Sequence, residues 1–281
     1  MQNIKNLGSF IKVEHTLFSL PLILSGTFLA ANGLPSLRLL FLIILAGIGA
    51  RTSALALNRI IDRDIDKKNP RTRTRELPSG KMSSLSAWSV AIVGTVIYFF
   101  SSYLICDLVF YLSPIPLIIF ILYPYMKRFT PLCHFGVGLG LALAPLGGWI
   151  AVTCSLNNLY PAILLSLFTF FWVSGFDIIY ATLDEESDKE TGVFSIVSTY
   201  GRISALRLSG VLHLLSFLSL AVLYLIYFEK SFFTLFFMIL TGVFLFLEHK
   251  KSSNVDMAFF KINIVIGFVI FLFILSGIYL N

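Results

Sequence analysis

Three polar side chains recur at intervals of four residues at the end of an apolar stretch. They are Asn58, Asp62 and Asp66, and on a helix residues with this spacing share one face. An amide oxygen and two carboxylates, each one turn apart, form a surface of hard oxygen donors. Such a surface suits Mg²⁺, which usually takes one or two carboxylates and completes its shell with water and substrate phosphate. The spacing therefore predicts a site for a magnesium-bound phosphate group.

A second acidic cluster follows another apolar stretch. Asp177, Asp184 and Asp188 lie at i, i+7 and i+11, which again places them on one face if the helix continues. Asp177 lies in an apolar stretch, where an unpaired charge is costly, so it is either functional or paired with a neighbouring helix. Glu185 and Glu186 could share a metal ion with this cluster. Two acidic faces could together hold magnesium ions against a diphosphate and stabilise it as a leaving group.

The composition of the chain indicates that these clusters belong to a membrane protein. Of the 281 residues 57% are hydrophobic and 13% charged, whereas about a quarter of a soluble chain is charged. A membrane-spanning helix needs about 20 mostly apolar residues. Nine such segments are predicted, at about 16–35, 39–58, 83–106, 108–126, 131–154, 159–180, 205–228, 231–247 and 260–280. We therefore expect one all-α integral membrane domain over residues 1–281.

The basic residues predict how this domain is oriented. A net charge of +6 would suit either nucleic acid or an anionic membrane surface. With nine spans and a cytoplasmic N-terminus, all of the 21 Lys and Arg residues except Arg38 and Lys230 fall on the cytoplasmic side, the run from Arg51 to Lys81 included. The positive-inside rule produces this bias. The sequence thus predicts a membrane partner, no nucleic acid, and acidic clusters at the cytoplasmic face.

The cysteines give no sign of covalent cross-links. Cys106, Cys133 and Cys154 lie in or near apolar segments and lack paired spacing. This pattern predicts no disulfide framework.

Three ordered motifs resemble the UbiA superfamily of intramembrane prenyltransferases. The first is the Asn58–Asp66 motif, followed by Asn69-Pro70-Arg71-Thr72 and Arg75-Glu76-Leu77-Pro78-Ser79-Gly80. The second is Tyr180-Ala181 with Asp184 and Asp188, running on to Gly201. The third, residues 123–130, resembles 4-hydroxybenzoate polyprenyltransferases in particular. Together they extend the resemblance over essentially the whole chain.

The resemblance implies a fold, a cofactor and a reaction. The fold would be nine transmembrane helices around a central cavity, capped by cytoplasmic loops. Asn58, Asp62 and Asp66 would bind one magnesium-diphosphate unit, and Asp184 and Asp188 the other. The reaction would move a polyprenyl group from polyprenyl diphosphate to an aromatic carboxylate in the bacterial inner membrane. The favoured acceptor is 4-hydroxybenzoate, for ubiquinone; a hydroxynaphthoate, for menaquinone, is the alternative.

Further side chains near these motifs are candidates for supporting roles. Cations can stabilise charge on the leaving diphosphate, a guanidinium can grip an acceptor carboxylate, and phenol rings can line the cavity. The same residue types also anchor proteins at the membrane surface. The candidates are Arg59, Arg71 and Lys127 for the diphosphate, Arg128, Tyr123, Tyr125 and Tyr180 for the acceptor, and Asp177 or Asp184 as the base.

A secondary transporter is the alternative from a different class of protein. Transporters also carry intramembrane acids, but at helices broken near the bilayer midplane. Here the acids gather at one face, beside long basic loops. This placement favours the transferase. Prenyl chain length and oligomeric state are not encoded in any pattern of the sequence.

Overall fold

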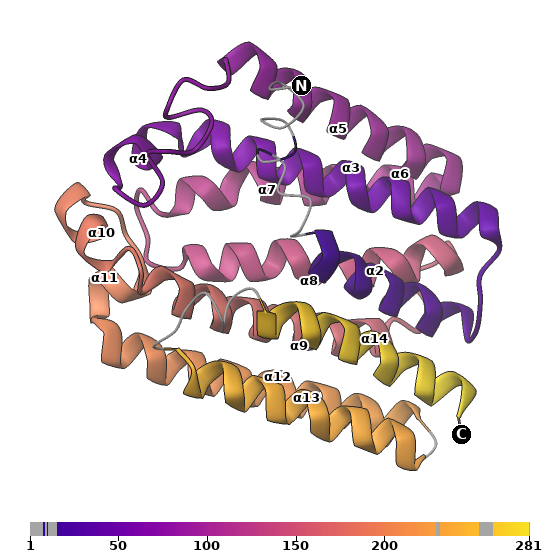
Figure 1. Ribbon diagram of the computed structural model, residues 1–281. Helices are drawn as coiled ribbons and strands as arrows, with labels where there is room; N and C mark the ends of the chain where they lie inside the picture. Colours follow the sequence, from indigo (N-terminus) through magenta and orange to yellow (C-terminus); the bar gives the residue numbers. More distant parts are fainter. Residues whose placement is uncertain (1–7, 9, 11–15, 229–230, 253–260, 281) are drawn as a thin grey trace.

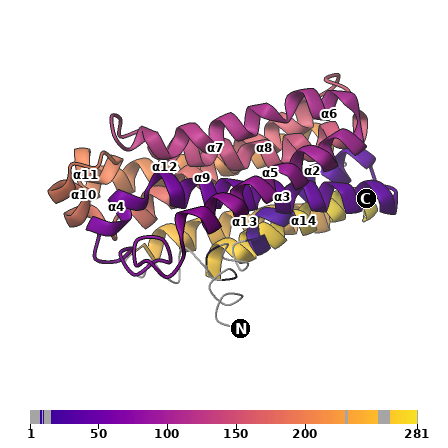
Figure 2. The ribbon, with the colours of Figure 1, turned by 90° about the horizontal axis from the view of Figure 1, so that it is seen from above.

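The protein is a bundle of long helices that run roughly alongside one another (Figure 1). The computed structural model describes residues 8, 10, 16–228, 231–252 and 261–280. Three short helices lie together at one end of the bundle in both views (Figures 1 and 2): α4 (Arg63–Lys68), α10 (Glu185–Thr191) and α11 (Ile196–Tyr200). The all-α prediction is confirmed.

The long helices follow the apolar segments of the sequence. They are α2 (Thr16–Ala31), α3 (Leu37–Ile61), α5 (Ser84–Ile105), α8 (Cys133–Thr153), α9 (Tyr160–Ala181), α12 (Arg202–Tyr227), α13 (Phe232–Lys250) and α14 (Asn263–Tyr279). One predicted span is divided into α6 (Asp107–Leu112) and α7 (Pro114–Met126), where Pro114 begins the second piece. Proline is favoured in the first turn of a helix because that turn needs no N–H donor there.

Seven stretches of the described chain are long and apolar enough to cross a bilayer. Two shorter apolar helices, Ser19–Ala31 and Asn263–Tyr279, occupy the first and last predicted segments. Large apolar side chains such as Phe41, Val96 and Ile226 are exposed on the outside, as expected for a surface that meets lipid. The chain is thus a multi-pass membrane protein, and the count of nine spans stays a prediction.

Small residues allow the helices of the interior to pack closely. α3 packs along α5, and a Cβ added to Gly49 would lie 2.7 Å from the backbone nitrogen of Tyr98. α2 packs on α8 in the same way, because a Cβ on Gly26 would collide with the carbonyl group of Pro145. Small residues at helix interfaces in membranes allow this close approach. The packing fixes α3, α8 and α9 around one interior space.

The end of the bundle opposite α4 and α10 carries a cross-link that the sequence did not predict. Cys106, between α5 and α6, forms a disulfide with Cys154, at the end of α8. The two Cα atoms are 6.4 Å apart although the residues are 48 apart in the sequence. Spacing alone could not reveal this pair, because helix packing brings the two ends together. The expectation of no disulfide was wrong.

Candidate active site

The first acidic cluster keeps its helical spacing in the structure. α3 ends at Ile61 and α4 begins at Arg63, but hydrogen bonds to the residue four positions earlier are present on both sides of the junction. The N–H of Asp62 donates to the carbonyl oxygen of Asn58 at 2.9 Å, and that of Asp66 to the carbonyl oxygen of Asp62 at 2.8 Å. Asn58, Asp62 and Asp66 therefore all line one cavity at this end of the bundle.

The second cluster does not lie on one continuous helix, contrary to the prediction. α9 ends at Ala181, and the N–H groups of Thr182, Leu183 and Asp184 bond to carbonyl oxygens three residues earlier, in a tightened turn. The hydroxyl of Thr182 also donates to the carbonyl oxygen of Ile179 at 2.7 Å. α10 then begins with Asp184 as its N-cap. A reset of the helical phase at this turn replaces the expected i, i+7, i+11 face.

Both clusters nevertheless line the same cavity, which we call the polar chamber. α3 and α4 contribute the first cluster, and α9 and α10 contribute Asp177, Asp184 and Asp188. α7, its C-cap and α8 contribute further side chains between them. The polar lining comprises Arg51, Asn58, Asp62, Asp66, Asn69, Arg71, Thr72, Arg75, Tyr123, Lys127, His134, Asp177, Tyr180, Asp184, Asp188 and Ser195.

Three acids of the chamber are each paired with a different cation. The ammonium of Lys127 donates to Asp62 at 2.6 Å. One terminal guanidinium nitrogen of Arg75 donates to both oxygens of Asp66, at 2.8 and 2.9 Å. Asp184 accepts a hydrogen bond from Nε of Arg71 at 2.8 Å, and another from the Asn69 amide at 2.7 Å.

These contacts and the burial set the charge of the acids in α10. Burial would raise the pKa of Asp184, but the hydrogen bonds and charge of Arg71 outweigh it and lower that pKa. Burial and the neighbouring Asp184 carboxylate raise the pKa of Asp188 to about 6. The pKa of Arg71 is raised, because its contacts with Asp184 and Tyr180 outweigh burial. Adjacent carboxylates thus have different affinities for a proton.

The donor set fits a hard divalent ion. Oδ1 of Asp62 is buried, and no hydrogen-bond donor reaches it from the described part of the chain. Mg²⁺ prefers carboxylate and amide oxygens, and Asn58, Asp62 and Asp66 offer these one turn apart. In this conformation no three His, Cys, Asp or Glu side chains among the described residues converge on one point. The acids face cations instead of each other.

Asp177 is paired with a residue that sequence reasoning left unassigned. Nδ1 of His134, on α8, lies 2.7 Å from Oδ2 of Asp177. The N–H of Ile196 donates to the other ring nitrogen of His134 at 3.4 Å, so the hydrogen-bond network places the ring proton on Nδ1. The interhelical pairing that the sequence left open for Asp177 is therefore present, and the carboxylate still borders the chamber.

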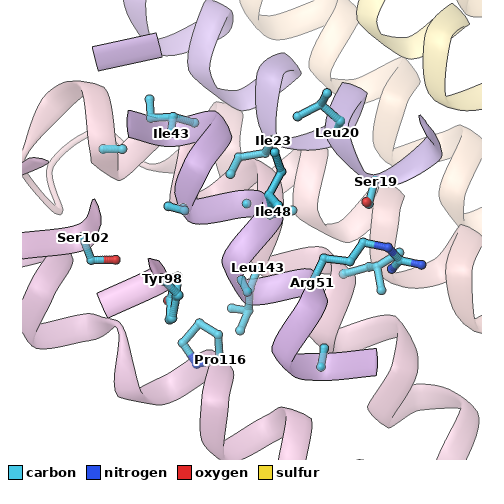
Figure 3. Close-up of a pocket in the computed structure, with 18 of the residues that line it drawn as sticks. Ser19, Leu20, Ile23, Ile43, Ile48, Arg51, Tyr98, Ser102, Pro116 and Leu143 are labelled. Atoms are coloured by element: carbon cyan, nitrogen blue, oxygen red, sulfur yellow. The ribbon is translucent and has the colours of Figure 1, made fainter. Parts of the chain in front are cut away.

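An apolar pocket lies next to the polar chamber, and Figure 3 shows the side chains that line it. Side chains of α2, α3, α5, α7 and α8 line it, including Ile23, Ile43, Tyr98 and Pro116. Five residues border both cavities: Arg51, Ala54, Phe120, Gly140 and Leu141. A charged cavity and an apolar cavity thus adjoin inside the bundle.

Arg51 stands where the two cavities meet, within α3 (Figure 3). The prediction that Arg51 lies in the cytoplasmic loop was wrong, because α3 continues for ten more residues, to Ile61. The spacing of Arg51 from the first cluster in the sequence could have predicted this position. Arg51 precedes Asn58 by seven residues, or two helical turns, and so shares the face of the first cluster.

Three predicted side chains do not line the chamber. Arg59 is buried beneath the Phe10 ring and pairs with Glu76 at 3.2 Å, because the loop after α4 brings that acid to it. Arg128 donates to the carbonyl oxygens of Ile61 and Pro124, at 2.6 and 3.1 Å, and its Nη1 lies 3.6 Å from Oδ1 of Asp62. Its guanidinium covers the ring of Tyr125, which is 44% exposed. These positions do not support Arg59 at the diphosphate or Arg128 and Tyr125 at the acceptor.

The extra glutamates of the second cluster also lie outside the chamber lining. Glu185 pairs with Lys189 at 2.7 Å, one turn along α10. Glu186 is exposed. The remaining predicted residues, Tyr123, Tyr180, Lys127 and Arg71, do line the chamber. Asn69, Arg75 and His134 join them, although these three were not among the predicted site residues.

Relatives with similar sequences carry one shared description. The chain is 29% identical to the 4-hydroxybenzoate octaprenyltransferase of Haemophilus ducreyi over 98% of this chain and 97% of that protein. It is 33% identical to the enzyme of the same name from Aliivibrio fischeri, over 70% of this chain and 66% of that protein. The second alignment thus spans about two thirds of the relative.

Solved structures agree with the fold. A UbiA homologue from Aeropyrum pernix, in its apo form, superimposes with a TM-score of 0.85 at 31% identity, covering 92% of this chain and 95% of that one. A UbiA homologue from Archaeoglobus fulgidus, bound to GPP and Mg²⁺, has a TM-score of 0.77 at 19% identity, with 97% and 98% covered. The model of the UbiA prenyltransferase family matches residues 19–277. The chain therefore belongs to the UbiA prenyltransferase family.

Proposed function

We propose that this protein transfers a polyprenyl group from polyprenyl diphosphate to the ring carbon beside the hydroxyl of 4-hydroxybenzoate, with Mg²⁺ as cofactor. The observation that carries the proposal is that two cavities adjoin inside a membrane bundle. Its polar chamber offers acids and cations for a metal-bound diphosphate, and its apolar pocket offers room for a hydrocarbon chain. The shared name of the bacterial relatives supports the acceptor.

The two acidic clusters are the proposed metal-binding groups. Mg²⁺ held by Asn58, Asp62 and Asp66 on one side and by Asp184 and Asp188 on the other would neutralise the diphosphate and stabilise it as a leaving group. The fit rests on the buried Oδ1 of Asp62 and on the oxygen donors that border the chamber with it.

Cations of the chamber complete the diphosphate site. Arg71 and Arg75, from the loop after α4, and Lys127, from the C-cap of α7, border the same space. As the carbon–oxygen bond of the allylic ester breaks, its electron pair passes to the diphosphate oxygen. Positive groups that are already in place stabilise this developing charge without reorganising. Tyr123 and Tyr180 also border the chamber, where their ring faces can stabilise the allylic cation.

Asp177 is the better of the two candidate bases. When the acceptor ring carbon forms its new bond to the allylic carbon, that ring carbon must lose a proton. Asp184 already accepts hydrogen bonds from Arg71 and Asn69, and its lowered pKa makes it a weak proton acceptor. Asp177 borders the chamber on the side of His134, which orients the carboxylate through its Nδ1.

Arg51 replaces Arg128 as the proposed anchor of the acceptor carboxylate. A guanidinium is the group best shaped to hold a carboxylate with two hydrogen bonds. Arg51 borders both cavities, next to the place where the diphosphate and the prenyl chain would join. An acceptor held there would face the allylic carbon.

The bacterial inner membrane, with the chamber toward the cytoplasm, is the proposed location. The bacterial relatives support the membrane, and the positive-inside bias supports the orientation. The disulfide of Cys106 and Cys154 lies at the opposite end of the bundle. Disulfides persist in oxidising compartments such as the periplasm, which agrees with that orientation.

A product assay tests the reaction. Purified protein is incubated with farnesyl diphosphate, Mg²⁺ and either 4-hydroxybenzoate or a dihydroxynaphthoate, and the products are identified by mass. We expect farnesylated 4-hydroxybenzoate, and none without Mg²⁺. Product from the naphthoate alone would move the function to the menaquinone route. No covalent product with either acceptor would contradict the proposal and favour the transporter.

The acceptor anchor is tested by comparing two arginine variants. We expect Arg51→Gln to raise the KM for 4-hydroxybenzoate by about 30-fold, because loss of one partner of a buried charge pair costs at least about 2 kcal/mol. The KM for farnesyl diphosphate should change much less. Arg128→Gln is the matched comparison, because its guanidinium bonds to backbone carbonyls, lies 3.6 Å from Oδ1 of Asp62 and lines neither cavity. A larger acceptor KM effect from Arg128→Gln would restore the original assignment.

A further inference from the structure

Three cations of the polar chamber are bound to the same acids that are the proposed metal ligands. Lys127 binds Asp62, Arg75 binds Asp66, and Arg71 binds Asp184. The three pairs join the first cluster, the loop after α4, the C-cap of α7 and the N-cap of α10. Each pair therefore consists of a group that suits a metal ion and a group that suits a diphosphate.

The two members of each pair differ in their freedom to move. The carboxylate side chains of Asp62, Asp66 and Asp184 are 3%, 8% and 14% exposed, whereas those of Lys127, Arg75 and Arg71 are 26%, 24% and 31% exposed. The acids sit at helix junctions, and the cations reach them on long side chains. If a pair opens, the cation is the member that can turn toward an incoming anion.

A metal ion alone would have to compete with these cations. Arg75 occupies both oxygens of Asp66, and no three metal-binding side chains in the described part of the chain yet converge. A cation displaced by the metal would lose its partner within a largely buried site, which is unfavourable. A diphosphate removes that obstacle, because its oxygens give the displaced cations new partners.

We infer that Lys127, Arg71 and Arg75 exchange partners when substrate arrives, leaving the carboxylates for the metal and binding the diphosphate. In the resting protein they neutralise the acids. Divalent metal and diphosphate consequently bind as a couple, and each binds weakly without the other. The inference rests on the proposed prenyl diphosphate donor and extends it to the order in which the site is assembled.

Arg75 gives the sharpest test because exchange predicts effects of opposite sign. In Arg75→Gln the carboxylate of Asp66 is no longer neutralised, so Mg²⁺ alone should bind about tenfold more tightly. Inorganic pyrophosphate in the presence of Mg²⁺ should bind about tenfold more weakly, because one of its cations is lost. Arg75→Lys keeps the charge and should lie between wild type and Arg75→Gln.

Titration calorimetry on the purified full chain measures both affinities, with inorganic pyrophosphate as the probe. In wild type we expect pyrophosphate to tighten Mg²⁺ binding on the order of 100-fold, within the usual range of coupling between sites. Arg63→Gln is the matched control, since Arg63 is exposed on α4 and donates to Ser84. The complex of Mg²⁺ with pyrophosphate in solution is the same for every variant, so differences between variants report the protein.

Three outcomes decide the question. Tighter Mg²⁺ and weaker pyrophosphate binding in Arg75→Gln support exchange. Weaker pyrophosphate with unchanged Mg²⁺ binding would make Arg75 a simple anion ligand and overturn it. Loss of both in Arg75→Gln and Arg75→Lys would make Arg75 structural and overturn it too. The experiment contains no acceptor and no prenyl chain, so it is independent of whether 4-hydroxybenzoate is the substrate.

Discussion

The two acidic clusters look alike in the sequence, but the backbone conformation within them differs. In the first, the N–H groups of Asp62 and Asp66 each bond to the carbonyl oxygen four residues earlier, although α3 and α4 are separate helices, so Asn58 and Asp66 line one cavity. In the second, a tight turn after Ala181 resets the register, which separates Asp177 from Asp184. The first cluster thus keeps all three of its polar groups on one surface. The second divides into a carboxylate paired with His134 and a pair of carboxylates on α10.

The largest expected effect tests whether both clusters are needed. We expect Asp62→Ala and Asp184→Ala each to lower kcat by about 10³-fold, the upper range for loss of one preorganised electrostatic group. Prenyl transfer is measured with farnesyl diphosphate and 4-hydroxybenzoate at saturating Mg²⁺. Asp64→Ala is the control, because Asp64 is exposed on α4 between Asp62 and Asp66. Membrane insertion of all three variants is checked by their yield in detergent extracts.

Normal turnover in Asp62→Ala or Asp184→Ala would contradict the prediction that both acidic clusters are needed. If only Asp62→Ala lost activity, the first cluster alone would hold the metal-bound diphosphate, and α10 would be a structural cap. If Asp64→Ala lost activity as well, the loss would report damage to α4 and not the removal of a ligand.

A smaller effect is expected for the isolated member of the second cluster. Asp177→Asn should lower kcat by about 10²-fold, the lower range for loss of a general base. It should leave binding of pyrophosphate with Mg²⁺ near the wild-type value, because Asp177 faces His134 and not a cation of the diphosphate site. Rapid-quench product analysis and calorimetry measure the two quantities. A parallel loss of pyrophosphate binding would return Asp177 to the metal site.

The fold could be predicted from the sequence because the bilayer leaves few choices. Apolar segments of about 20 residues become helices, so α5, α8 and α9 lie close to the predicted 83–106, 131–154 and 159–180. The first cluster was equally readable, since the junction at Asp62 keeps hydrogen bonds of helical spacing, and a spacing of four residues then gives a shared face. Where local geometry decides the outcome, one sequence is sufficient.

The remaining parts of the site depend on contacts between distant segments. Arg59 looked like a ligand until the loop after α4 brought Glu76 to it. His134 gained its role only when α8 packed beside α9 and met Asp177. The disulfide of Cys106 and Cys154 likewise joins two helix ends that sequence spacing does not relate. Such pairings need the packing of the whole bundle, which a linear pattern does not contain.

The smallest expected effect concerns Glu185, which lies next to the second cluster but does not line the chamber. Glu185 forms an i, i+4 pair with Lys189, and pairs of this kind contribute only about 0.3–0.5 kcal/mol. We therefore expect Glu185→Gln to change kcat/KM, and the Mg²⁺ concentration for half-maximal activity, by less than about twofold. Asp188 is buried and borders the chamber. Asp188→Asn is therefore the variant to compare with Glu185→Gln, and it should raise the Mg²⁺ concentration for half-maximal activity. A tenfold rise with Glu185→Gln would make Glu185 a metal ligand. The second cluster would then hold three donors on α10, and its difference from the first cluster would lie in position and not in number.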